Sequence, residues 1–171
     1  MIQRVLFVCS GNTCRTPMAA VLFRDLVAKD ATYRESGMEA RSAGTTATGG
    51  EPAAELAVSA LRHRGVELGP HRATGFSQEV AAWADVILTM TEAHRRAVVQ
   101  RAPAAGPKTF TIASYAGGDG DVEDPLDQGT EAYERCAVRL SELMPRVAAR
   151  MCGLGPTTAQ QLTTGNLCAP W

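Results

Sequence analysis

The sequence has little of what marks membrane, secreted or nucleic-acid-binding proteins. Its 17 Lys and Arg residues meet 18 Asp and Glu residues, giving a net charge of -1 at pH 7. This balance excludes the global basic surface that nucleic acid or anionic lipid needs. No apolar stretch is long enough to span a bilayer, and the first apolar run is too short for a secretory signal. We expect a cytoplasmic protein with neither a nucleic acid nor a membrane as partner.

The cysteine pattern excludes a disulfide framework and a zinc site. The chain has five cysteines, an odd number at irregular positions, without paired CxxC spacing. Cys136 and Cys152 fall in or beside a predicted helix, where a small buried hydrophobic role is expected. Cys168 lies in the terminal segment. We predict free thiols, no bound metal and no cofactor.

Short apolar segments alternate with stretches whose apolar residues recur at helical spacing. The predicted strands are Arg4–Val8, Glu39–Ser42, Asp85–Met90 and Lys108–Ile112, and the predicted helices are Met18–Lys29, Pro52–Arg64, Glu92–Gln100 and Gly129–Met151. Residues 44–50 and 116–128 are predicted loops, the second rich in Gly and acidic residues. The alternation predicts an α/β fold, a four-stranded parallel sheet with helices on both faces.

The length of 171 residues fits one domain with a single core, and no linker interrupts it. Beyond Arg150 the chain has no charged side chain and shows neither helical nor strand periodicity. We therefore predict a domain over residues 1–152 and an uncharged tail over residues 153–171, with Trp171 as the expected anchor of the tail.

The turn after the first strand carries the strongest functional signal. An apolar run ends at Cys9, and Arg15 opens a helix six positions later. Such a turn directs backbone N–H groups into one concavity, and the helix N-terminus adds positive charge, so a phosphate-like dianion and a Cys9 thiolate are both favoured. Gly11 and Asn12 are the residue types that most readily take left-handed backbone geometry. The alternative is a buried thiol before a Thr-capped helix.

These residues supply what displacement at phosphorus requires. Cys9 is the candidate nucleophile, and the planar guanidinium of Arg15 can hold two phosphate oxygens. Asp124 is the candidate general acid, because Pro125 stiffens its loop and favours an extended backbone at the Asp. Thr16 is expected to cap or start the helix and to hydrogen-bond the thiolate.

Several segments, in order along the chain, resemble the low-molecular-weight protein tyrosine phosphatase family. They are CSGNTCRTP at residues 9–17, Arg41-Ser42-Ala43-Gly44, His71, Asp85–Met90 and Asp124-Pro125, and the resemblance spans about Gln3 to Met151. It implies that Cys9 forms a phosphocysteine, that Arg15 clamps the phosphate, and that Asp124 acts as acid and then as base for water, without a metal.

The resemblance also assigns supporting residues. The phosphate-binding loop after the first strand would comprise Ser10, Gly11, Asn12, Thr13, Cys14 and Arg15. Asn12, Ser42 and His71 would form a hydrogen-bonded network that holds this loop in its left-handed turn.

The residues around the pocket depart from the phosphotyrosine pattern. Family members that take phosphotyrosine usually carry a bulky aliphatic residue at the position of Thr13 and an aromatic residue just after the Asp-Pro, where Leu126 and Asp127 stand here. Thr13 resembles the bacterial branch that acts on protein phosphoarginine, and Asp124 and Asp127 beside the mouth would favour a cation. Thr16 replaces the usual Ser. We predict hydrolysis of phosphoarginine on phosphorylated proteins, with phosphotyrosine as the nearest alternative.

Two other functions stay open. An arsenate reductase needs further cysteines that reach Cys9; Cys14 could be one, whereas Cys136, Cys152 and Cys168 are expected in a late helix and tail. A non-catalytic phosphate-binding module would need the loop amides and the arginine, but neither the nucleophile nor the acid.

The same loop predicts redox sensitivity. Cys9 and Cys14 wind around one anion site, so their side chains are expected within disulfide reach. Cys9 would be oxidised first, and Cys14 would resolve its sulfenic acid.

Overall fold

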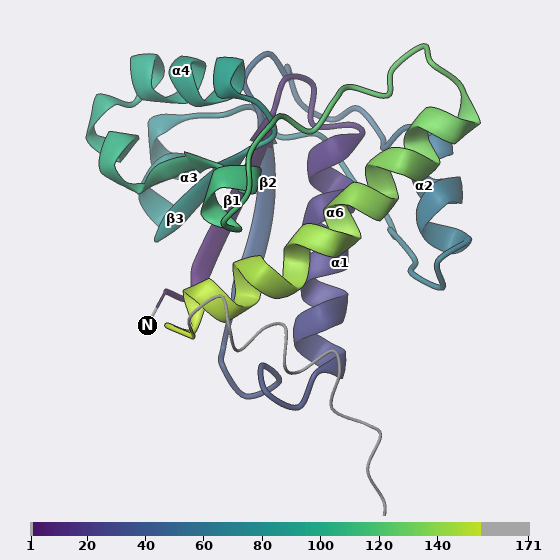
Figure 1. Ribbon diagram of the computed structural model, residues 1–171. Helices are drawn as coiled ribbons and strands as arrows, with labels where there is room; N and C mark the ends of the chain where they lie inside the picture. Colours follow the sequence, from purple (N-terminus) through teal and green to yellow (C-terminus); the bar gives the residue numbers. More distant parts are fainter. Residues whose placement is uncertain (1, 155–171) are drawn as a thin grey trace, which may run out of the picture.

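Four parallel strands form the centre of the molecule. The computed structural model describes residues 2–154. Its strands are β1 (Arg4–Cys9), β2 (Glu39–Gly44), β3 (Val86–Thr89) and β4 (Thr109–Thr111), in the spatial order β2-β1-β3-β4 (Figure 1). All neighbouring strands pair in parallel. The predicted four-stranded parallel sheet is therefore confirmed.

The direction of the strand order reverses between β1 and β3. After β1 the chain continues to β2 on one side, and it later returns to β3 on the other side. Ligands of open α/β sheets bind at such a reversal, outside the carboxyl ends of the strands. The turns after β1 and β3 are therefore the places to look for a site.

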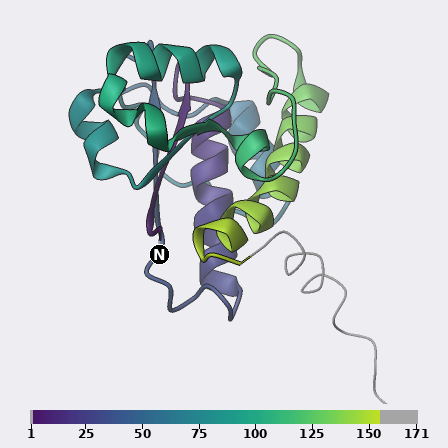
Figure 2. The ribbon, with the colours of Figure 1, turned by 60° about the vertical axis from the view of Figure 1, so that its left-hand side comes forward.

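Helices cover both faces of the sheet (Figure 1, Figure 2). On one side lie α1 (Arg15–Lys29), α2 (Glu55–Arg62), α5 (Ile112–Tyr115) and α6 (Thr130–Met151), and on the other lie α3 (Gln78–Trp83), α4 (Glu92–Arg101) and the 3-10 helix η1 (Pro103–Lys108). This arrangement confirms the predicted layers.

The apolar side chains of β1 pack against the helices on both faces of the sheet. Val5 and Phe7 pack into the cluster with α1 and α6, whereas Leu6 and Val8 pack into the smaller cluster with α3, α4 and η1. The Phe7 ring meets Phe23 of α1 edge to face, with centroids 6.0 Å apart. Fully burying such a side chain stabilises the fold by about 1.5–3 kcal/mol. A continuous apolar strand is thus explained by burial on both faces.

Element boundaries depart from the sequence prediction where short capped turns intervene. The predicted strand to Ile112 stops at Thr111, because Thr111 caps α5 by accepting a hydrogen bond from the Ser114 backbone N–H. The helix predicted from Pro52 begins at Glu55. Helices α3, α5 and η1 were not predicted, since four to six residues are too few to show a helical period.

The chain leaves α6 through Gly153, whose φ of 75° favours glycine. The Leu154 N–H closes the helix end on the Ala149 carbonyl at 2.8 Å. The rest of the predicted tail, with Trp171, lies outside the described residues. Between residues 2 and 154, no helix is long and apolar enough to cross a membrane.

Candidate active site

The loop between β1 and α1 turns its carbonyl groups outward. Four of these carbonyls accept hydrogen bonds from surrounding segments: Cys9 from Thr45 N (2.8 Å), Ser10 from Thr46 N (3.0 Å), Asn12 from His71 Nε2 (2.7 Å) and Thr13 from Ala54 N (2.9 Å). Because the carbonyls point away, the loop N–H groups are left to face the concavity at the start of α1. This polarity is what an anion requires.

Asn12 holds the turn from inside. It is fully buried, and its φ of 57° places it in the left-handed region. Its side-chain Nδ2 donates to Thr16 Oγ1 at 2.9 Å, and its Oδ1 accepts from the Thr74 N–H at 2.8 Å. Together with His71, Asn12 forms the predicted supporting network. Gly11 does not share the left-handed geometry that the sequence suggested for both residues.

The third predicted member of this network does not join it. Ser42 is half-buried beside Phe7 in the β1–β2 register, and it makes no side-chain hydrogen bond with the described residues. The contact with the loop comes instead from Gly44, two residues further along β2. A Cβ at Gly44 would lie 2.9 Å from the Asn12 backbone N and closer still to the Ser10 carbonyl oxygen. Only glycine fits there, because both neighbours are backbone atoms.

Thr16 is placed to stabilise a Cys9 thiolate. Helix α1 begins at Arg15 with Cys14 at the N-cap, so Thr16 lies in the first turn of the helix and neither caps nor starts it. Its Oγ1 lies 3.1 Å from Cys9 Sγ. Since this oxygen already accepts from Asn12 Nδ2, its own hydrogen is free to be donated to the sulfur. The Asn12 backbone N–H is a second donor to Cys9 Sγ, at 3.4 Å.

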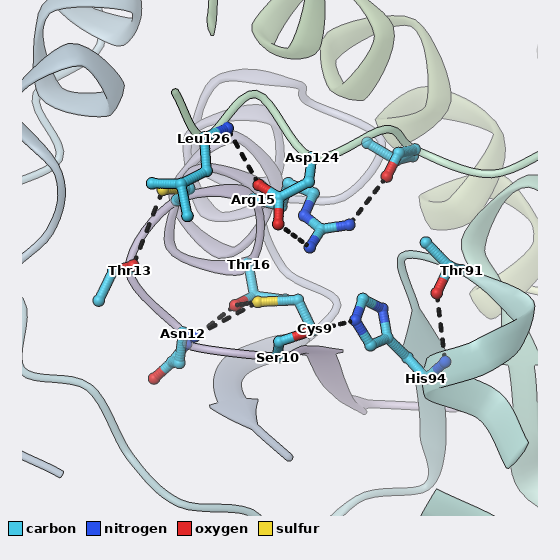
Figure 3. A network of polar contacts seen from close by, with 12 residues as sticks. Cys9, Ser10, Asn12, Thr13, Arg15, Thr16, Thr91, His94, Asp124 and Leu126 are labelled. Carbon is cyan, nitrogen blue, oxygen red and sulfur yellow. Dashed lines mark hydrogen bonds and ion pairs between the residues drawn. The ribbon is translucent and has the colours of Figure 1, made fainter. Parts of the chain in front are cut away.

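Arg15 is the buried cation of the site. Its side chain is 5% exposed, Nη1 donates to the Val122 carbonyl at 3.1 Å, and Nη2 donates to the Asp124 carboxylate at 2.9 Å (Figure 3). A guanidinium has five N–H donors, so further donors remain for a phosphate. The ion pair holds the Asp124 carboxylate beside the loop, where it lines the same cavity.

The acidic loop, residues 116–128, is held by a hydrogen bond at Asp121 and is exposed further along. The Asp121 carboxylate accepts from the Glu92 N–H at the first residue of α4, at 3.0 Å. Further along, Asp124 is half-exposed and accepts from the Leu126 N–H at 3.1 Å. Asp127, which was predicted beside the mouth, is exposed and is not among the residues that line the cavity.

A cavity of about 250 Å³ opens above the loop. Its lining consists of Cys9, Ser10, Gly11, Asn12, Thr13, Cys14, Arg15, Thr46, Asp124 and Leu126. The structure therefore brings together the whole predicted loop, the predicted acid and two predicted selectivity residues. Ser42 and His71 lie outside the lining.

His94 is a site residue that the sequence analysis missed. It lies in the first turn of α4, is 8% exposed, and its Nε2 is 2.8 Å from Ser10 Oγ (Figure 3). Burial, reinforced by the charge of Arg15, lowers the pKa of His94 to about 4, although Asp124 and Asp121 oppose the shift. A signal did exist: His94 follows the carboxyl end of a strand in an α/β sheet, where ligand sites form.

The thiols near the site are free. Cys14 Sγ lies 3.3 Å from the hydroxyl of Tyr133 on α6. Cys136, one turn further along α6, lines a neighbouring cavity of about 260 Å³ with Asp124. Burial raises the pKa of Cys136 to about 12, so it stays protonated and is a poor nucleophile. Within residues 2–154, no cluster of three or more His, Cys, Asp or Glu side chains is placed to hold a metal.

An amide-lined cavity with a thiol at its floor and a buried guanidinium beside it can bind a phosphoryl group and expose it to nucleophilic attack. The model of the family "Low molecular weight phosphotyrosine protein phosphatase" matches residues 4–152. The chain belongs to this family, and it is a low-molecular-weight, cysteine-dependent protein phosphatase.

Relatives of the chain divide between two substrates. A protein-arginine-phosphatase of Geobacillus stearothermophilus is 38% identical over 88% of this chain and 97% of the relative. A probable low-molecular-weight protein-tyrosine-phosphatase of Ralstonia nicotianae is 30% identical over 91% of this chain and all of the relative. The structure of a YwlE arginine phosphatase mutant with a phosphorylated active-site serine superimposes with a TM-score of 0.77 at 31% identity, covering 96% of this chain and 98% of that one.

Proposed function

We propose that this phosphatase hydrolyses phosphoarginine on proteins. The observation that carries the proposal is the wall of the cavity, where Thr13 offers a short, half-buried side chain with a hydroxyl. A phosphoguanidine has N–H groups that can donate hydrogen bonds to a hydroxyl oxygen. A phenyl ring has none, and it packs better against an aliphatic wall. The half-exposed carboxyl group of Asp124 lines the same cavity, and its oxygens can accept hydrogen bonds from the same N–H groups. The relative named a protein-arginine-phosphatase supports this choice.

In the proposed reaction, Cys9 Sγ attacks phosphorus while the loop N–H groups and Arg15 hold the phosphate oxygens. The S–P bond forms and the P–N bond to the guanidino group breaks. The departing nitrogen takes the proton of Asp124. This carboxylate then deprotonates a water molecule, which attacks the phosphocysteine and releases inorganic phosphate and the Cys9 thiolate. Thr16 stabilises that thiolate at the start and at the end of the cycle.

Phosphotyrosine is a second candidate because of one observation. Leu126, at the edge of the cavity, is 56% exposed, and a phenyl ring could pack against this side chain. The relative named as a probable protein-tyrosine-phosphatase is consistent with that choice.

The deciding experiment compares kcat/KM on matched phosphoarginine and phosphotyrosine peptides. We expect the parent enzyme to prefer phosphoarginine, and Thr13→Ile to shift the ratio toward phosphotyrosine by about 10–200-fold, the range for one pocket side chain. Thr13→Ser is the matched control that keeps the hydroxyl and should keep the preference. Cys9→Ser defines the background. Faster cleavage of phosphotyrosine by the parent, with no change in Thr13→Ile, would reject phosphoarginine as the substrate.

A further inference from the structure

The contact between Ser10 and His94 joins the two strand ends that flank the site. Ser10 follows β1 and lines the phosphate cavity, whereas His94 belongs to α4, directly after β3. Their side chains meet at 2.8 Å, between Ser10 Oγ and His94 Nε2 (Figure 3). Either atom of such a pair can be the donor, and the tautomer of the imidazole decides which one is.

The surroundings of the imidazole favour one tautomer. His94 Nδ1 is buried and has no hydrogen-bond partner among residues 2–154. If Nδ1 carried the proton, a buried N–H group would lack an acceptor, which is rarer and costlier than a buried acceptor without a donor. The ring is also kept neutral, because it is buried and lies near Arg15, and its place in the first turn of α4 puts it at the positive end of the helix dipole. The proton of a neutral ring then resides on Nε2.

This tautomer determines which way the Ser10 hydroxyl points its hydrogen. With the hydrogen on Nε2, Ser10 Oγ accepts from His94, and its own hydrogen is left for another acceptor. No second partner of Ser10 Oγ exists among the described residues. Ser10 lines the cavity together with Cys9 and Arg15, so this hydrogen is available to an anion bound there. With the opposite tautomer, Ser10 would give its hydrogen to the ring and turn a lone pair toward the phosphate.

We propose that neutral His94 is a positioning residue which makes the Ser10 hydroxyl a hydrogen-bond donor to the bound phosphate. His94 itself is not among the residues that line the cavity. The tautomer of His94 determines whether the Ser10 hydroxyl donates or accepts a hydrogen bond in the cavity. As a donor, the Ser10 side chain adds to the backbone N–H groups of the loop. The proposal concerns the phosphoryl group alone, and it holds whether the leaving group is arginine or tyrosine.

The first test measures the tautomer directly in the parent protein. Two-bond nitrogen–proton correlation spectra of the 15N-labelled imidazoles distinguish a protonated Nε2 from a protonated Nδ1. The His94→Gln variant identifies the His94 signals among those of His63 and His71. We expect a neutral ring protonated on Nε2 at pH 7. A ring protonated on Nδ1 would overturn the proposal.

The second test is a double-mutant cycle on the affinity for inorganic phosphate, measured as competitive inhibition. Ser10→Ala should weaken phosphate binding by about 10- to 100-fold, as expected for a hydrogen bond to a charged group. His94→Phe should cause most of this loss alone, and little more in the Ser10→Ala background. His94→Gln, whose amide N–H can still donate to Ser10, should recover much of the affinity.

The double-mutant cycle shows whether His94 acts through the Ser10 hydroxyl or only stabilises the fold. Equal losses from His94→Phe with and without the Ser10 hydroxyl would show that His94 merely supports the fold, and the proposal would fail. Unchanged phosphate affinity in Ser10→Ala would refute the donor role. Because inorganic phosphate has no organic group, these outcomes are independent of whether phosphoarginine is the substrate.

Discussion

Two residues with left-handed backbone, one in each loop of the site, show how differently the two loops are held. Asn12 has φ 57° and Asp127 has φ 60°. Asn12 is fully buried and bonded on both side-chain polar atoms and on its carbonyl. Asp127 is exposed and makes no side-chain hydrogen bond within residues 2–154. The left-handed conformation of Asn12 is therefore fixed by tertiary contacts. The same conformation at Asp127 is adopted by a residue that is exposed to solvent.

The difference fits the work of the two loops. The phosphate-binding loop, residues 10–15, must present its N–H groups in one arrangement. The close approach of Gly44 and the hydrogen bond between His71 and the Asn12 carbonyl hold the loop in that arrangement. In the proposed reaction, Asp124 has to leave Arg15 so that its carboxyl group can give up a proton and take one back. Arg15 is only 5% exposed, whereas Asp124 is 48% exposed, so water can solvate the carboxylate as it leaves the guanidinium.

The largest expected effect tests the acidic loop. Asp124→Asn should lower kcat by about 10²–10⁴-fold, the usual contribution of a general acid, and should leave phosphate binding nearly intact. The loss should shrink for substrates whose leaving groups need little protonation. Asp127→Asn is the matched control and should keep most of the activity. Near-native rates of Asp124→Asn on poor leaving groups would assign the acid to another residue, with Asp127 next in line.

The second prediction concerns oxidation of the phosphate loop. Peroxide should inactivate the parent reversibly, with dithiothreitol restoring most activity, because Cys14 captures the sulfenic acid of Cys9 as a disulfide. In Cys14→Ser, inactivation should become largely irreversible. Cys136→Ser is the control, since its protonated, buried thiol should not compete. Equal recovery in the parent and in Cys14→Ser would show that Cys14 only packs in the core, where it is hydrogen-bonded to the Tyr133 hydroxyl.

The third prediction compares the two left-handed residues directly. Glycine tolerates positive φ, so replacing either residue by Gly removes the side chain without straining the backbone. Asn12→Gly should lower the free energy of unfolding by about 1–3 kcal/mol, because buried partners such as the Thr74 N–H lose their acceptor. Asp127→Gly should change it by less than about 0.5 kcal/mol. Denaturant unfolding measures both, and equal effects would erase the contrast between the loops.

The last prediction concerns the pH dependence of stability. His94 has its pKa lowered to about 4 in the folded protein, whereas an unfolded His titrates near 6.5. Between these pH values the unfolded state binds more protons, so the contribution of His94 to stability falls as pH drops from about 6.5 to 4, by at most about 1.4 kcal/mol per pH unit. Above pH 6.5 it is constant. His94→Gln should unfold with a shallower pH dependence; an identical slope in both proteins would contradict the shifted pKa.

Local patterns in the sequence were sufficient for most of the fold and for the phosphate loop. A continuous apolar run from Val5 indicated a buried strand, and the alternation of strands with helical periods indicated a parallel sheet with helices on both faces. Cys9, Arg15 and Thr16 are close in the chain, so a strand–turn–helix geometry is enough to bring them together. Such information is carried by neighbouring residues, which is why it can be read from the sequence.

Only the tertiary structure decided which distant residues reach this loop. Ser42 and Gly44 lie two positions apart on β2, and the close approach of the loop backbone selects Gly44. His94 reaches Ser10 because β1 and β3 are neighbours in the sheet, although 84 residues separate the two in the chain. Cys136 comes beside Asp124 because α6 packs across α1. Strand order and helix packing depend on the sum of many burial terms, and no local pattern specifies which side chains those terms bring into contact.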